Sequence, residues 1–194
     1  MALKYKRILL KISGEALGGE KGMGFDEPTM DAICGGVKKA HELGVQIGIV
    51  VGGGNFWRGR SSGKMERTLA DKIGMLATVM NALAVSDKLE QLGVPTEVFT
   101  SITMPQVAQP FTRKDALRAM DEGKIAVFGG GTGNPFFSTD TATALRAVEV
   151  SADVMFKATM VDGVYDKDPH KYPDAKKYDT LTFTKVLEDQ LAVM

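Results

Sequence analysis

Cysteine and histidine are scarce in this chain of 194 residues, which has one cysteine, Cys34, and two histidines, His41 and His170. A single cysteine excludes an internal disulfide, and so few sulfur and imidazole ligands argue against a zinc cluster. Excess charge is absent as well, because 24 Lys and Arg residues balance 24 Asp and Glu residues. We therefore expect no broad surface for nucleic acid or membrane, and an anion site must be built locally.

Long hydrophobic runs, repeats and low-complexity tracts are also missing. Residues 1–7 lead into an apolar run too short for a signal sequence, and no later run is expected to approach membrane-spanning length. Together with the lone cysteine, this pattern predicts a cytoplasmic protein. The chain does contain 44% hydrophobic and 25% charged residues, which is enough for one well-packed domain over 1–194 without a linker.

Short apolar runs alternate with longer amphipathic ones along the chain. Strands are expected at 8–12, 45–51, 97–101, 125–128 and 154–158, and helices at 29–43, 69–92, 113–121 and 141–150. Alternation of this kind produces parallel strands that are connected by helices. It predicts an α/β fold, in the form of a three-layer α/β/α sandwich with a mostly parallel central sheet.

The boundaries and faces of the expected helices carry local signals. Asp26 and Pro28 predict the start of the first helix, and Gly44 and Gly93 predict the ends of the first two. Asp71 is expected to open the long helix, as a cap or as a charge that complements the helix dipole. Core packing is the favoured interpretation of the apolar stripe on that helix, and a subunit contact is the alternative. The stripe consists of Ile73, Leu76, Ala77, Met80, Leu83 and Ala84.

The segment 129–140, Gly-Gly-Gly-Thr-Gly-Asn-Pro-Phe-Phe-Ser-Thr-Asp, follows an expected strand and leads into an expected helix. Glycines let the backbone approach a ligand, and free amides at the positive end of a helix favour phosphate. Phe136 and Phe137 offer faces or edges to a flat base. The segment therefore suits a nucleoside monophosphate, although a glycine-rich turn with an ordinary cap explains the local pattern equally well.

Two earlier segments also end expected strands with groups that suit phosphate. The segment 11–15 brings a lysine, Lys11, which can hold a phosphate as a point charge. The segment 50–59 runs into three glycines and then Arg58, which can add a forked cation. Neither segment has the spacing of a P-loop, and Trp57 breaks the dinucleotide fingerprint. A solvated lysine and a surface loop are the alternative interpretations.

Further polar groups could complete a nucleotide site. Asp71 could bind a ribose hydroxyl instead of capping its helix. In the segment 157–169, Tyr165 could cover an adenine, and Asp162 or Asp168 could accept hydrogen bonds from base or sugar. Turn formation by the Asp-Gly and Asp-Pro pairs is the alternative interpretation of that segment.

Taken together, five segments resemble the bacterial UMP kinases of the amino acid kinase family in order and spacing. These segments are 11–17, 52–59, 74–81, 132–140 and 161–165, and the similarity runs from Lys6 to Met194. Thr-Gly-Asn-Pro-Phe-Phe and Gly-Met-Leu-Ala-Thr-Val-Met-Asn are the narrower motifs among them. The resemblance implies an amino acid kinase-like fold and transfer of the γ-phosphoryl group of ATP to UMP, which gives UDP and ADP in pyrimidine nucleotide biosynthesis.

The resemblance also implies roles for individual residues. The expected ATP-binding residues are Lys11, Ile12, Ser13, Gly14, Gly54, Arg58, Thr159, Tyr165 and Asp168. The expected UMP-binding residues are Gly53, Asp71, Thr132, Gly133, Asn134, Pro135, Phe136, Phe137, Ser138 and Thr139. The expected catalytic residues are Lys11, Arg58 and Asp140, of which Asp140 orients the catalytic cation. The segment tied to GTP activation matches Gly19, Glu20, Lys21, Gly22, Met23 and Gly24.

Cofactors and partners are implied in the same way. Members of the family use Mg²⁺, which is expected to be held mainly through the ATP phosphates, and form homohexamers with GTP as activator and UTP as inhibitor. They continue beyond the match to Met194 with an active-centre aspartate, a helix and closing strands, so the domain is expected to lack the C-terminal end of the family.

Two other functions are open. One is a nucleotide-binding storage or regulatory subunit without turnover. The other is an amino acid kinase that acts on a small acid, which Phe136, Phe137 and Asp71 disfavour because a small acid needs neither a base platform nor a ribose acceptor. The residues do not decide between UMP and CMP.

Overall fold

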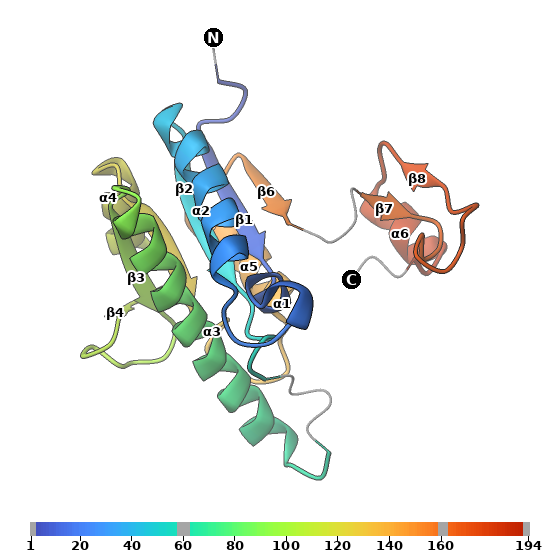
Figure 1. The fold of residues 1–194 in the computed structure, drawn as a ribbon, viewed down its shortest axis with the longest axis horizontal. Coiled ribbons are helices and arrows are strands. Elements are labelled where there is room, and N and C mark those ends of the chain that lie inside the picture. The colour runs from blue at the N-terminus through green and yellow to red at the C-terminus, as the bar shows by residue number, and fades with distance from the viewer. Residues whose placement is uncertain (1–2, 58–62, 159–162, 192–194) are drawn as a thin grey trace. The chain divides into compact units, whose positions relative to one another are not determined.

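The computed structural model describes residues 3–57, 63–158 and 163–191 (Figure 1). The chain divides into two compact units, Met1–Ala158 and Thr159–Met194, which are described separately. The first unit contains a six-stranded sheet of order β4-β3-β5-β2-β1-β6, in which all neighbouring strands are parallel. The predicted α/β fold with a mostly parallel sheet is confirmed, and a single domain over 1–194 stays a prediction.

The expected elements of the first unit are all present, and their ends differ from the predicted ones by at most two residues. The strands are β1 (Arg7–Ile12), β2 (Gln46–Val51), β3 (Thr96–Thr100), β4 (Gln109–Pro110), β5 (Ile125–Gly129) and β6 (Val154–Lys157). The helices are α1 (Gly14–Leu17), the 3-10 helix η1 (Gly19–Lys21), α2 (Glu27–Glu42), α3 (Arg67–Gln91), α4 (Arg113–Asp121) and α5 (Thr139–Glu149). The short elements α1, η1 and β4 were not predicted.

Two hydrophobic clusters lie on opposite faces of the sheet. Ile47 and Ile49 of β2 pack in the cluster that includes residues of α2 and α3. Val50, the next residue, packs in the cluster that includes residues of α4, with Val150 at the end of α5. Successive side chains of a strand point to opposite faces. Helices therefore cover both faces, as Figure 1 shows, and the three-layer sandwich is confirmed.

The start of α3 differs from the prediction. Glu66 is the N-cap, and its carboxylate accepts hydrogen bonds from the backbone amides of Thr68 and Leu69, each at 2.9 Å. Asp71 lies more than one turn further along. The prediction that Asp71 opens the helix was therefore wrong, because a glutamate that folds back on the first turn does the capping.

The apolar stripe predicted on α3 is only partly buried. Ala77 is buried, whereas Leu76, Met80 and Leu83 are 47%, 48% and 37% exposed. Core packing was therefore the wrong interpretation for these three residues. Small and polar residues line much of the buried face, and a search for large apolar side chains overlooks them. The buried residues of α3 are Ala70, Met75, Ala77, Thr78, Val79, Asn81, Ala82, Val85, Ser86 and Leu89.

By length and composition, α3 is also apolar enough to cross a membrane, contrary to the expectation that no run approaches that length. This is weak evidence, because the core helix of a soluble protein passes the same test. The ten residues that α3 buries within the first unit are typical of a core helix.

The second unit is small and was not predicted beyond its turns. It contains an antiparallel pair, β7 (Val164–Tyr165) and β8 (Lys177–Tyr178), followed by α6 (Phe183–Glu188). Asp166 closes the β7–β8 pair, because its amide donates to the carbonyl of Lys176 at 3.0 Å and its carboxylate accepts from the Lys176 amide at 2.8 Å.

Candidate active site

The carboxyl ends of β1, β2, β5 and β6 share one edge of the parallel sheet. The turns that follow β1 and β2 touch there: a Cβ atom on Gly14 would lie 2.5 Å from the Gly54 nitrogen and 2.7 Å from the Gly52 oxygen. Real Cβ atoms do not approach backbone so closely, so position 14 requires glycine. The ends of strands in open α/β sheets are where such proteins bind ligands.

Asp140 joins two lysines at this edge. Lys11, near the end of β1, places Nζ 3.1 Å from Oδ1 of Asp140, and Lys157, at the end of β6, places Nζ 3.1 Å from Oδ2. The pairing of β1 with β6 aligns the two lysines directly, so both side chains leave neighbouring strands at the same level. Asp140 approaches them from the first turn of α5.

The charge of this cluster suits a phosphate. Partial burial acts to raise the pKa of the Asp140 carboxyl, but the hydrogen bond from Lys157 and the charge of Lys11 outweigh it and hold that pKa below its ordinary value. The carboxylate is therefore ionised at neutral pH. Two ammonium groups and one carboxylate leave one net positive charge at the strand ends, where an anion can bind.

Lys157 was not predicted as a site residue. The lysine ends an expected strand, as Lys11 does, and this shared position was the available signal. A strand-end lysine is more often solvated, however, and the parallel register that pairs the two strands cannot be read from the residues alone.

The turn after β5 is held from two sides. Gly130 and Gly133 have φ angles of 78° and 81°, which favour glycine. The Gly130 amide donates to Oγ1 of Thr78, a buried residue of α3, at 2.8 Å. Ser101 Oγ donates to the carbonyl oxygen of Gly131 at 2.8 Å. The predicted UMP-binding segment 132–139 therefore starts from a fixed backbone.

Asp71 connects α3 to this segment. Its Oδ2 accepts a hydrogen bond from the Phe136 amide at 2.8 Å, and Arg67 Nε lies 2.8 and 2.9 Å from its two oxygens. Phe136 has a φ of 72°, a strained conformation for a residue other than glycine, and the long-range hydrogen bond that its amide donates to Asp71 helps to hold it. As whole residues, Phe136 and Phe137 are 64% and 58% exposed, so both are accessible to a ligand.

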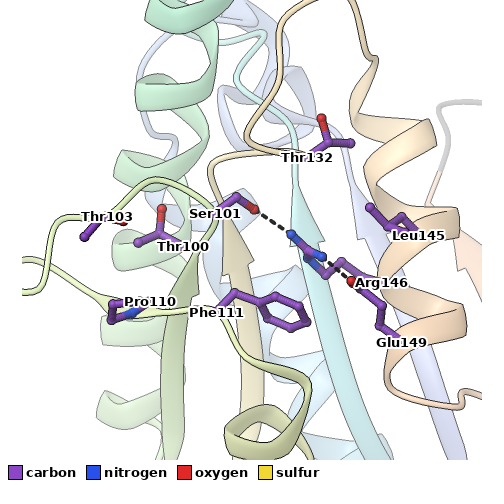
Figure 2. Close-up of a pocket in the computed structure, with 9 residues that line it drawn as sticks. All are labelled: Thr100, Ser101, Thr103, Pro110, Phe111, Thr132, Leu145, Arg146 and Glu149. Carbon is purple, nitrogen blue, oxygen red and sulfur yellow. Dashed lines mark hydrogen bonds and ion pairs between the residues drawn. The ribbon is translucent and has the colours of Figure 1, made fainter.

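A pocket of about 320 Å³ lies beside Thr132 (Figure 2). Within it, the buried Arg146 donates to Ser101 Oγ at 2.6 Å, pairs with Glu149 and lies 3.8 Å over the ring of Phe111. Arg146 thus ties α5 to the end of β3, next to the turn after β5. The lining residues are Thr100, Ser101, Thr103, Pro110, Phe111, Thr132, Leu145, Arg146 and Glu149.

With this geometry in view, comparison with known proteins decides the family. The sequence profile of the Amino acid kinase family matches residues 6–193. The chain belongs to the amino acid kinase family. The crystal structure of UMP kinase from Bacillus anthracis is 36% identical, with 98% of this chain and 80% of that chain covered at a TM-score of 0.94. UMP kinase from Ureaplasma parvum is 34% identical, with 99% and 83% covered at a TM-score of 0.92. The predicted family is confirmed.

In this member of the amino acid kinase family, several predicted site residues use their side chains locally. Ser13 Oγ caps α1 by accepting from the Ala16 amide at 3.2 Å, and Ser138 Oγ caps α5 by accepting from the Thr141 amide at 3.1 Å. Thr132 Oγ1 accepts from the Asn134 amide at 3.2 Å. The side chain of Ile12 is fully buried, so a nucleotide contact at this position would involve its backbone.

The remaining predicted residues fall into two groups. Arg58, Thr159 and Asp162 lie outside the described residues. Tyr165 and Asp168 lie in the second unit, and the structure does not assign them to the strand ends. Asp168 accepts a hydrogen bond from the His170 amide at 3.0 Å, which lowers the pKa of its carboxyl and forms a local turn.

Proposed function

We propose that this member of the amino acid kinase family transfers the γ-phosphoryl group of ATP to UMP and so produces UDP and ADP. The observation that carries the proposal is the Lys11–Asp140–Lys157 cluster at the strand ends, where the glycine turns after β1 and β2 also meet. Two UMP kinases that share more than a third of their residues with this chain, at TM-scores of 0.94 and 0.92, support the substrate.

The chemistry requires alignment and charge neutralisation rather than a base. The phosphate of UMP is already an anion at neutral pH, so it can attack without losing a proton to the protein. Lys11 holds the transferring phosphoryl group, and Lys157 adds a second positive charge 3.1 Å from the same carboxylate. Asp140 positions both lysines rather than contacting substrate. Arg58 and the glycine amides are proposed to offset the charge that develops.

We assign the two nucleotides to adjacent sides of the strand ends. ATP is proposed to contact residues 11–14 and Gly54, together with Arg58, Thr159, Tyr165 and Asp168. UMP is proposed to contact Gly53, Asp71 and residues 132–139. The bond between Asp71 and Phe136 supports this assignment, because it brings the proposed ribose acceptor to the proposed base platform.

Magnesium is proposed to enter with ATP. Within residues 3–57, 63–158 and 163–191, no three or more His, Cys, Asp and Glu side chains are grouped to hold a metal ion. The residues that are present fit an ion held mainly by phosphate oxygens, as Mg²⁺ commonly is. When bound, the ion would neutralise charge on the phosphates, and Asp140 would remain paired with its two lysines.

Regulation, location and assembly are proposed from the family resemblance. GTP is proposed as an activator at residues 19–24 and UTP as an inhibitor, within cytoplasmic pyrimidine biosynthesis. A homohexamer is proposed as the assembly. The exposed Leu69, Leu76, Met80 and Leu83 support a subunit contact, because spacings of 7, 4 and 3 residues place them on one side of α3.

Thermal unfolding with separate ligands tests the substrate class. At a hundredfold excess over the dissociation constant, a specific ligand adds about 2.7 kcal/mol and raises the midpoint by a few degrees. We expect a shift with UMP and none with aspartate or glutamate, while CMP tests selectivity for the base. A shift with an amino acid would contradict the proposal. UMP binding without UDP formation from ATP would indicate a binding subunit instead of a kinase.

The role of Lys11 has a kinetic test. Replacing Lys11 with alanine removes a charge that acts on the transferring group, so we expect kcat to fall by about 100-fold or more while the KM for UMP changes much less. Equal losses in kcat and UMP affinity would show that Lys11 serves general nucleotide binding.

A further inference from the structure

Two buried amide side chains lie behind the glycine turn after β2. Asn55, within that turn, is 2% exposed, and Asn81, on the inner face of α3, is fully buried. They bond to each other twice: Asn81 Nδ2 donates to Asn55 Oδ1 at 2.7 Å, and Asn55 Nδ2 donates to Asn81 Oδ1 at 3.1 Å. Nothing in the proposed mechanism uses either residue.

The other bonds of the pair go to backbone in glycine segments. Asn81 Nδ2 also donates to the Gly52 carbonyl at 2.6 Å, and Asn55 Nδ2 donates to the Gly24 carbonyl at 2.7 Å. The Gly24 amide donates back to the Asn55 carbonyl at 3.2 Å. The network also touches the turn after β1, because a Cβ on Gly14 would lie 2.6 Å from Asn55 Oδ1. Three segments that carry predicted nucleotide or effector residues therefore meet at one amide pair.

The bond to Gly52 has a directional consequence. In a trans peptide the carbonyl and the following N–H point in opposite directions, and no cis peptide occurs among the described residues. Because Asn81 draws the Gly52 carbonyl toward α3, the Gly53 amide is aimed away from α3. A buried amide is costly unless its bonds are satisfied, and an apolar side chain would pack α3 against the sheet without that risk.

We propose that Asn55 and Asn81 are positioning residues, which hold the backbone of Gly52–Gly54 for phosphate and align the turn at Gly22–Gly24 with it. This inference rests on the proposed function. It predicts that the pair acts on nucleotide affinity through the turn rather than by touching the nucleotide.

Alanine substitutions separate positioning from packing. In Asn81→Ala, the turn after β2 loses a buried partner, so we expect the KM values for UMP and ATP, which are proposed to contact Gly53 and Gly54, each to rise about tenfold. Asn55→Ala should behave similarly. The KM values of the double variant should rise no more than those of the more impaired single variant, since the two residues act as a unit.

Ser86→Ala is the matched control. Ser86 is a buried residue of the same helix, and its Oγ lies 2.5 Å from Oγ1 of Thr96. Thr96 is at the amino end of β3, away from the carboxyl ends of the strands. It should lower the melting temperature and leave both KM values unchanged. All kinetics are compared well below the melting temperature of each variant. If folded Asn81→Ala keeps kcat and both KM values within twofold of the unmodified chain, the pair serves packing and the proposal is overturned.

The unmodified chain separates this inference from the proposed function. If it forms no UDP, the proposed function fails, and the pair is judged from ATP binding by calorimetry. Binding about tenfold weaker in Asn81→Ala than in the unmodified chain and in Ser86→Ala would support positioning, and equal binding would overturn it. A chain that neither forms UDP nor binds ATP would overturn both proposals.

Discussion

Asp140 organises the charge of the site at the scale of a single residue. The register of β1 with β6 brings Lys11 and Lys157 side by side, where two ammonium groups would repel each other. The carboxylate lies 3.1 Å from each lysine and compensates for that repulsion. Its own ionisation is favoured in return, so the three groups stabilise one another as long as the carboxylate keeps its charge.

Acid should weaken this stabilisation. The pKa of Asp140 is lower in the folded chain than its ordinary value of about 3.9, so its contribution is fully present above pH 4 and is lost as pH falls through the folded pKa. In Asp140→Asn the contribution is missing at every pH. We therefore expect the difference in unfolding free energy between the two chains, measured with urea, to shrink below about pH 4. A difference that stays constant from pH 7 to pH 3 would contradict the pairing.

Lys157 should matter for turnover. Replacing it with methionine removes one of the two positive charges at the strand ends, and we expect kcat to fall by about tenfold or more. Lys124→Met is the matched control, because Lys124 also pairs with two carboxylates, Glu97 at 3.0 Å and Glu122 at 3.1 Å, but lies before β5 at the other end of the strand. Steady-state kinetics should show the loss in the first variant alone, and equal activity in both would exclude a role for Lys157.

At the scale of elements, the turns at the carboxyl ends of the strands carry many of the predicted site residues. The turn after β5 needs its glycines for two reasons, backbone conformation and space. Gly130 has a φ of 78°, and a Cβ there would lie 2.8 Å from Thr100 Oγ1 and 2.9 Å from the Ser101 nitrogen. Thr78 and Ser101 then anchor the same turn by hydrogen bonds. A turn constrained in this way presents the predicted UMP-binding segment 132–139 in one conformation.

A pair of glycine substitutions separates the two reasons. Gly123 has a φ of 81°, and among the described residues no heavy atom beyond its chain neighbours lies within 4 Å of the place that a Cβ would take there. Gly123→Ala should therefore cost only the left-handed conformation, about 1 kcal/mol. Gly130→Ala adds a clash with backbone and should cost clearly more. Urea unfolding measures both changes. Equal losses would mean that the turn relaxes without difficulty around the added methyl group.

At the scale of the whole molecule, the long helix α3 has one side that is buried in the core and another side that is exposed. One side of it supplies buried residues to the core and holds Asn81 and Thr78 beneath the glycine turns. The other side exposes Leu69 together with Leu76, Met80 and Leu83 of the apolar stripe, and the helix extends past the ends of the strands in Figure 1. A helix with two such sides can join the core of one copy to another copy.

Disrupting the stripe should change the assembly. Introducing charge by Leu76→Glu together with Met80→Glu should lower the mass in solution, measured by light scattering, to that of a smaller oligomer or a single chain. Val148→Glu is the control, because Val148 is 78% exposed on α5, outside the stripe. If the double variant keeps the mass of the unmodified chain, the stripe is not a subunit contact.

Much of the fold could be predicted from the residues. Asp26, Gly44 and Gly93 mark helix ends correctly, because capping and left-handed turns are local properties. Asp71 was misjudged although capping is local, because Glu66 caps the helix by accepting hydrogen bonds from the Thr68 and Leu69 amides. Leu76 was misjudged because the side of a helix that is buried depends on neighbours that are distant in sequence.

Residues of the candidate site also fall into two groups, those that the sequence indicates and those that only contacts in the folded chain reveal. Lys11 and the glycine segments were predicted from their position at expected strand ends, and Asp140 was predicted from the family resemblance. Lys157, Asn81 and Arg146 were not, since each is recognised by its contact with a residue in another element: Asp140, Gly52 and Ser101 respectively. Such partners become neighbours only when the strands pair in a particular order.

The sequence by itself determined the alternation of strands and helices, the parallel sheet between two helical layers, and the strand ends at which an anion can bind. These features follow from hydrophobic period, turn residues and backbone geometry within short segments. The tertiary structure alone decided which lysines share Asp140, which amides hold the glycine turn and which side of α3 is exposed. Those contacts join residues up to well over a hundred positions apart, as Lys11 and Asp140 are, and only the pairing order of the strands brings such residues together.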